Sequence, residues 1–117
     1  MWQGMNQRRF PRVGYHCTVS MSQGGKYSTI PALTENLGLG GVCLMLEQEF
    51  DIFSPAGLEL HLEDGKPPIE VKGTIVWVVR RRELGKKMAF DTGIEFSNLS
   101  PQDKTRIEIV LDKIAGT

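Results

Sequence analysis

Short alternations of apolar and polar residues, separated by glycine and proline, constrain the fold of this sequence most strongly. Residues 58–63 read Leu-Glu-Leu-His-Leu-Glu. Because successive side chains of a strand point to opposite faces, this period of two predicts a strand with one buried face. Further strand-like segments, bounded by turn-forming residues, lie at 15–21, 27–34, 41–46, 69–79 and 88–96.

The pattern changes to a helical period near the end of the chain. Apolar residues recur at spacings of three and four, at Ile107, Val110, Leu111 and Ile114. Ser97 or Ser100 can cap such a helix, and Pro101 suits its first turn. Six short strands followed by one helix predict a mainly β fold. We expect residues 13–117 to form a six-stranded antiparallel, Greek-key-like β-barrel with a C-terminal helix at about 101–114.

Single residues give three further expectations for the predicted strands. Pro31 lacks a donor for a sheet ladder, which predicts an edge position or a bulge. Residues 36–41 (Asn-Leu-Gly-Leu-Gly-Gly) are expected to form a tight glycine-rich loop that leads into the third strand. The inward-facing residues of segment 69–79 are expected to be Val71, Gly73, Ile75 and Trp77.

Composition restricts the class of protein. A chain of 117 residues fits one domain, and 14 basic residues balance 14 acidic ones, which argues against an extended polyanion such as a nucleic-acid polymer as partner. Cys17 and Cys43 stand apart from each other and from any Cys-x-x-Cys pattern. We therefore expect buried, reduced thiols in a cytoplasmic protein and no metal site.

The lengths of the apolar runs also favour a cytoplasmic protein. No apolar run approaches the roughly 20 residues that a membrane helix needs, so membrane insertion is not expected. Residues 1–12 lack the apolar segment of a signal peptide.

The charge is distributed unevenly along the chain. Residues 1–34 carry four basic and no acidic residues, residues 35–70 have a net charge of −7, and residues 71–117 have a net charge of +3. In the first stretch, Arg8, Arg9 and Arg12 supply planar guanidinium donors that match phosphate and the O6/N7 edge of guanine. Residues 1–12 are expected to form a flexible arm that can wrap an anion. A solubilising basic tail is the alternative.

Taken together, the arginine segment and the glycine-rich segment resemble the PilZ domain family. That family has an RxxxR segment before its first strand and, about two dozen residues later, (Asp/Asn)-x-Ser-x-x-Gly. Residues 74–77 and 93–96 are also similar to the family, and the resemblance spans about residues 7–114. The matching residues are Arg8, Arg9 and Arg12 in the first motif and Asn36, Gly38 and Gly41 in the second.

The resemblance implies a receptor for cyclic di-GMP, a bacterial second messenger, with no cofactor. The arginines would hold phosphates and guanine edges, and the second motif would line the other side of the ligand. Gly38 replaces the usual serine; one lost hydroxyl hydrogen bond is worth about 0.5–1.5 kcal/mol, up to about tenfold in affinity. Trp77 is a further candidate, for stacking on guanine, with core packing as the alternative.

Three hypotheses for the function follow. The first is a cytoplasmic receptor that is expected to signal to an unidentified protein partner and not through a fused output domain. The second is a PilZ-fold adaptor that binds no ligand, which Gly38 favours. The third is a small nucleic-acid-binding barrel, which the basic segment 80–87 favours and the zero net charge opposes. No histidine or serine lies in a sequence motif that would supply a catalytic partner. We therefore expect no catalytic residue and do not expect an enzyme.

Overall fold

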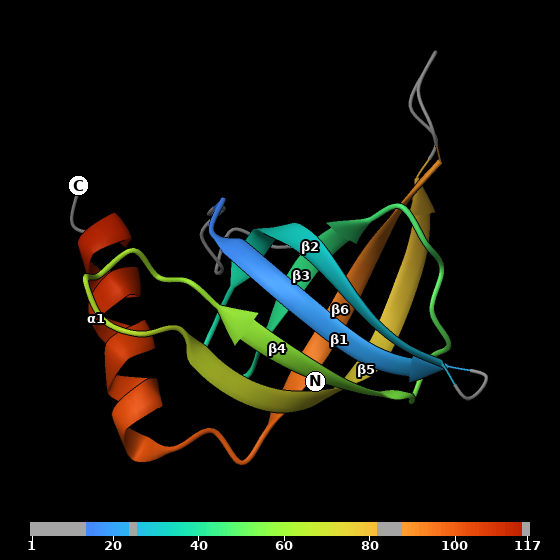
Figure 1. The fold of residues 1–117 in the computed structure, drawn as a ribbon. Helices are drawn as coiled ribbons and strands as arrows, with labels where there is room; N and C mark the ends of the chain where they lie inside the picture. Colours follow the sequence, from blue (N-terminus) through green and yellow to red (C-terminus); the bar gives the residue numbers. More distant parts are fainter. Residues whose placement is uncertain (1–13, 24–25, 82–87, 116–117) are drawn as a thin grey trace.

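The chain folds into a closed β-barrel with one helix at its end (Figure 1). The computed structural model describes residues 14–23, 26–81 and 88–115. The arginines of the predicted arm therefore lie outside the described residues. The elements are β1 (His16–Gln23), β2 (Lys26–Leu37), β3 (Gly41–Leu46), β4 (Pro55–Leu60), β5 (Ile69–Arg81), β6 (Ala89–Ser97) and α1 (Pro101–Ala115).

All strand pairs are antiparallel. The spatial order is β1-β2-β3-β6-β5-β4, and β4 closes the barrel by pairing with β1. This order confirms the predicted six-stranded antiparallel barrel with a C-terminal helix. Within the described ranges, no helix is long and apolar enough to cross a membrane.

The barrel interior is filled by the inward rows of the strands. Leu58, Leu60 and Leu62 are at most 4% exposed, which confirms the period-two prediction, although β4 itself ends at Leu60. Helix α1 covers one end of the barrel and buries Ile107 and Val110 in the same core. Ser100 caps this helix: its hydroxyl oxygen accepts a hydrogen bond from the Asp103 amide at 3.1 Å.

Polar contacts join α1 to the loop between β4 and β5. The Arg106 guanidinium donates from Nε and Nη2 to the two carboxylate oxygens of Asp64, at 3.0 and 2.9 Å. Arg106 holds the pKa of Asp64 below its usual range through these hydrogen bonds. The end of the barrel is thus closed by apolar packing and by a bidentate ion pair.

A bulge in β2 corrects one prediction. Thr34 pairs with Leu44 and Asn36 pairs with Cys43, so Glu35 is an extra residue in the ladder. The strand continues to Leu37, and Asn36 therefore lies in β2 and not in the expected loop. Pro31 pairs with Thr18 of β1 in the part of β2 that precedes the pairs with β3, consistent with the expected edge position.

A second bulge, in β5, corrects the prediction for Trp77. Ile75 pairs with Ile94 and Trp77 pairs with Gly93, so Val76 is the extra residue. One added residue reverses the faces of all side chains that follow it. Val71, Gly73 and Ile75 are buried as predicted, but Trp77 lies on the outer face of the barrel.

Candidate ligand-binding site

The first described residues are tied to β2 next to its bulge. The Tyr15 amide donates to the Thr34 hydroxyl at 3.0 Å, and the Thr34 amide donates to the Tyr15 carbonyl at 2.9 Å. This pairing places Tyr15 beside Thr34, the residue that precedes the bulge at Glu35. The described chain therefore begins beside the strand that carries Asn36, whereas the arginines of the first motif lie outside the described residues.

The turn between β2 and β3 is closed by its own backbone. The Gly38 amide donates to the Gly41 carbonyl at 2.9 Å, and the Gly40 carbonyl accepts from the Phe96 amide at 2.9 Å. Gly38 and Gly41 are buried, whereas a side chain on Gly40 would meet no atom within 4 Å. The Gly38 amide is therefore engaged in the turn.

A small pocket of about 230 Å³ opens on the outer face of the barrel beyond this turn. Asn36 and Trp77 both line it, so the structure brings together two of the predicted site residues. Gly38 and Gly41 do not line the pocket, but they follow Asn36 in the chain. The other lining residues are Glu35, Cys43, Val79, Arg81 and Asp91.

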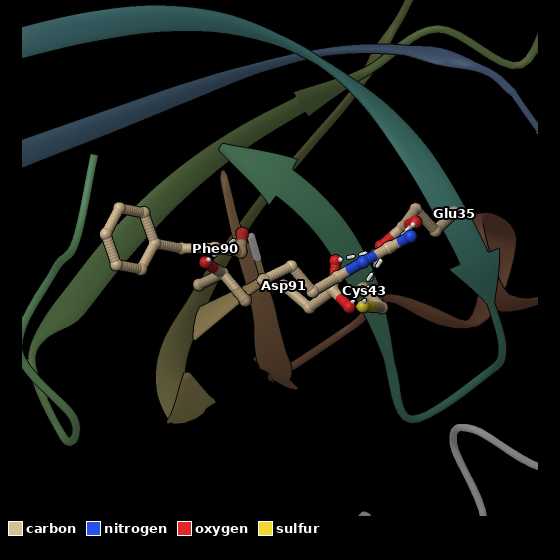
Figure 2. A network of polar contacts seen from close by, with 6 residues as sticks. Glu35, Cys43, Phe90 and Asp91 are labelled. Carbon is tan, nitrogen blue, oxygen red and sulfur yellow. Dashed lines mark hydrogen bonds and ion pairs between the residues drawn. The ribbon is translucent and has the colours of Figure 1, made fainter. Parts of the chain in front are cut away.

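The pocket contains a network of polar contacts centred on Arg81. Its Nη1 donates to Glu35 Oε2 at 3.0 Å and to Asp91 Oδ1 at 3.2 Å. The Cys43 thiol lies 3.7 Å from Glu35 Oε1 and donates to it. Figure 2 shows Glu35, Cys43 and Asp91 gathered at one place, while the Phe90 side chain points the opposite way.

Burial and neighbouring charges shift the acidities of this network. Partial burial raises the pKa of Glu35, and Asp91 adds to the rise, whereas Arg81 opposes it. Burial, with the carboxylates of Glu35 and Asp91, also raises the pKa of the Cys43 thiol. Cys43 is therefore a protonated donor at neutral pH.

Trp77 forms one wall of the pocket and rests on Gly93 of the neighbouring strand. A Cβ atom at residue 93 would lie 2.3 Å from an indole carbon, so only glycine permits this packing. The core-packing alternative for Trp77 is wrong, because its indole lies outside the barrel core.

Glu35, Arg81 and Asp91 were not among the predicted site residues. Segment 80–87 is predicted to be a charged hairpin tip, and no sequence signal distinguishes Arg81 from the basic residues next to it. Arg81 is 46 residues from Glu35 along the chain, so only the barrel topology brings them together. The described residues hold no group of three or more His, Cys, Asp or Glu arranged to bind a metal ion.

A comparison with known protein families identifies the family of the chain. The model of the PilZ domain family matches residues 6–112, a range that includes all the predicted site residues. The chain belongs to the PilZ domain family.

Solved structures with a similar fold include other PilZ proteins. The PilZ domain of YcgR from Escherichia coli, with c-di-GMP, has a TM-score of 0.67 and 18% identity, covering 95% of this chain and 93% of that one. MrkH of K. pneumonia in its apo state has a TM-score of 0.71 and 18% identity, and the match covers 95% of this chain and 52% of that one. The inhibitor of motility MotI/DgrA from Bacillus subtilis has a TM-score of 0.67 and 16% identity, and the match covers 94% of this chain and 51% of that one.

These TM-scores show a shared fold. This PilZ domain spans nearly all of the YcgR domain but only about half of MrkH and of MotI/DgrA. No curated protein sequence matches the chain significantly.

Proposed function

We propose that this PilZ domain is a receptor for cyclic di-GMP that passes its signal to a protein partner. The observation that carries the proposal is the pairing of Tyr15 with Thr34. Arg12 precedes Tyr15 by three residues, so it lies at most about 11 Å along the chain from this anchor. The RRxxR segment can therefore reach the Asn36 edge of the barrel.

Structural relatives support the identity of the ligand. The YcgR PilZ domain and MrkH are both known in complex with c-di-GMP. Because their identity to this chain is only 18–19%, these complexes support the proposal through the shared fold and not through shared binding residues. The two motifs supply the link to this chain.

The ligand chemistry fits the residues that the two motifs provide. Cyclic di-GMP has two phosphates and two guanines, and Arg8, Arg9 and Arg12 can donate to both kinds of group. Asn36, Gly38 and Gly41 would line the opposite side of the ligand. The indole of Trp77 offers a stacking face for one guanine.

The size and charge of the described pocket explain why the arm is needed. A volume of about 230 Å³ is below the ~300–1,000 Å³ of pockets that enclose a small-molecule ligand, so the pocket suits one base. When both carboxylates are ionised, the negative charge of Glu35 and Asp91 exceeds the positive charge of Arg81. The pocket wall is then unfavourable for a dianion. The arginines of segment 8–12 would offset that repulsion.

The proposed receptor is not an enzyme and acts in the cytoplasm. No cofactor is required, because recognition uses only arginine, amide, backbone and aromatic groups. Ligand binding would fix residues 1–12 against the barrel and change the surface that a partner protein meets.

Isothermal titration with cyclic di-GMP tests the proposal, with GTP and a linear GMP dinucleotide as competitors for specificity. We expect saturable binding at micromolar concentration or below. Each charge-assisted hydrogen bond is worth about 1.5–3 kcal/mol, so Arg8→Ala or Arg12→Ala should weaken binding by one to two orders of magnitude. Arg80→Ala is the matched control, because its exposed side chain pairs with Glu49 outside the pocket.

One observation favours the second candidate, an adaptor that binds no ligand. Position 38 has no hydroxyl, and its amide already donates to Gly41. Absence of binding heat and of a thermal shift at millimolar cyclic di-GMP, with the variants indistinguishable from the parent, would establish the adaptor instead.

A further inference from the structure

Two large apolar side chains project from the loop between β3 and β4. Phe53 is 77% exposed and Ile52 is 47% exposed, whereas Phe50 in the same loop is buried in the core. The loop lies at the end of the barrel opposite α1, far from the helix that closes the other end (Figure 1). Contiguous exposed apolar side chains, unlike single scattered ones, are typical of interaction sites.

The backbone of Phe53 is also in an unfavourable conformation. Its φ is 71°, in the left-handed region that a bulky side chain rarely adopts. Asn98 has a similar φ of 54°, but asparagine is a common residue in that region. A turn that only reverses the chain would take Gly, Asn or Asp at position 53. At this position a bulky apolar side chain therefore has an unfavourable backbone conformation and remains in contact with water.

Hydrogen bonds hold this loop against β5. The Phe53 amide donates to the Ile75 carbonyl at 2.6 Å, and the Ile75 amide donates to the Ser54 carbonyl at 3.0 Å. The Ser54 amide and hydroxyl both donate to the Asp51 carbonyl. The two apolar side chains are therefore presented by a fixed backbone, which lowers the entropy lost on binding.

Acidic residues lie in the same loop as the exposed pair. Glu47, Glu49 and Asp51 are all exposed, and Arg80 of β5 pairs with Glu49 at 3.6 Å. The remaining negative charge opposes contact with an anionic membrane surface. It also opposes a symmetric contact with a second copy, because the same acids would then face one another.

We propose that Ile52 and Phe53 form a docking element for a different protein that carries an apolar pocket bordered by Lys and Arg. Phe53 fills the pocket, and Glu47 and Asp51 face the basic border. The inference specifies the partner in the proposed function but does not require ligand binding.

A stability measurement tests whether Phe53 serves binding and not folding. Asparagine tolerates a positive φ, so Phe53→Asn should leave the Tm of the full chain equal to or above that of the parent. A Tm several degrees below the parent value would overturn the proposal, because Phe53 would then be needed by the fold.

Site-specific cross-linking identifies the partner for a direct test. A photoreactive phenylalanine analogue is placed at position 53 in cells of the native host, and at Ile109, an exposed residue of α1, as the control. The protein captured only from position 53 is then purified and titrated with the full chain. Absence of any product specific to position 53 would contradict the proposal.

The titration gives quantitative expectations. Phe53→Ala should weaken binding at least 30-fold, as for a central aromatic anchor, and Ile109→Ala should not change it. The double variant Glu47→Gln, Asp51→Asn should weaken binding several-fold and reduce its salt dependence. Unchanged affinity in Phe53→Ala would overturn the proposal. So would Phe53-dependent dimerisation, or Phe53-dependent binding to vesicles of 70% phosphatidylcholine and 30% phosphatidylglycerol.

The same titration separates this inference from the ligand proposal. It is repeated with and without cyclic di-GMP, and in the Arg8→Ala, Arg12→Ala background. If the chain fails to bind cyclic di-GMP, the loss of partner affinity in Phe53→Ala should remain. If the chain binds cyclic di-GMP but Phe53→Ala has no effect on the partner, the docking inference alone is wrong.

Discussion

The indole of Trp77 lies so close to Gly93 that the two residues depend on each other. A Cβ atom at position 93 would come within 2.4 Å of the indole nitrogen and within 2.8 Å of a second ring carbon. Glycine at position 93 therefore allows the bulge in β5 to turn Trp77 outward and keep it flat on the barrel wall. This wall of the candidate site is set by a pair of residues on adjacent strands.

Gly93→Ala should destabilise the domain by about 1–3 kcal/mol, because the new methyl group must displace a ring or the backbone. It should also shift the fluorescence of Trp77, measured in a Trp2→Phe background so that one tryptophan reports. Denaturant unfolding gives the free-energy change. Gly40→Ala is the control, since its Cβ would meet nothing within 4 Å and its φ is not positive. Equal stability of the two variants would show that the indole moves away without cost.

Gly38→Ser should raise the affinity for cyclic di-GMP by up to about tenfold. The substitution restores the hydroxyl that the PilZ motif usually has, and one neutral hydrogen bond is worth about 0.5–1.5 kcal/mol. Titration calorimetry of parent and variant measures the change. A decrease in affinity would mean that the added side chain obstructs the turn or that the ligand does not reach it.

Asp64→Asn should lower stability by about 1 kcal/mol at pH 7, since the pair with Arg106 is bidentate and each side chain is less than 20% exposed. Because the folded-state pKa of Asp64 is depressed, the ionised form stabilises the fold above the unfolded pKa of about 3.9. This contribution is lost as the pH falls through the lower, folded-state pKa.

Urea unfolding at several pH values tests this sign. The difference between parent and Asp64→Asn should be largest near neutral pH and should vanish in strong acid. Glu59→Gln removes a carboxylate from an exposed pair with His61 and serves as the control, with little effect expected. A difference that grows toward low pH would contradict the assignment.

Ser100→Ala should cost about 1 kcal/mol, because it removes the hydroxyl that accepts from the Asp103 amide at the start of α1. Ser97→Ala, three residues earlier in β6, should have a much smaller effect. Thermal unfolding of the two variants compares them directly. If Ser97→Ala were the more harmful change, the cap would lie at Ser97.

The sequence determines the type and order of the elements, because period-two and period-3.6 patterns are local properties. The leucines of residues 58–62 are buried as their spacing predicts, and the apolar row of α1 packs against the core, with Ile107 and Val110 buried and Leu111 and Ile114 partly buried. Both PilZ motifs are also readable without coordinates, since they are short and have a defined spacing. The contacts of Arg8, Arg9 and Arg12 remain predictions, because these residues lie outside the described part of the chain.

Only the tertiary structure decides which face Trp77 and Asn36 occupy. A bulge adds one residue to a strand and reverses the side chains that follow, and its position depends on pairing with another strand. The Arg81 network and the pair of Arg106 with Asp64 join residues 46 and 42 positions apart, respectively. Such contacts depend on strand order and register, which local sequence patterns do not specify.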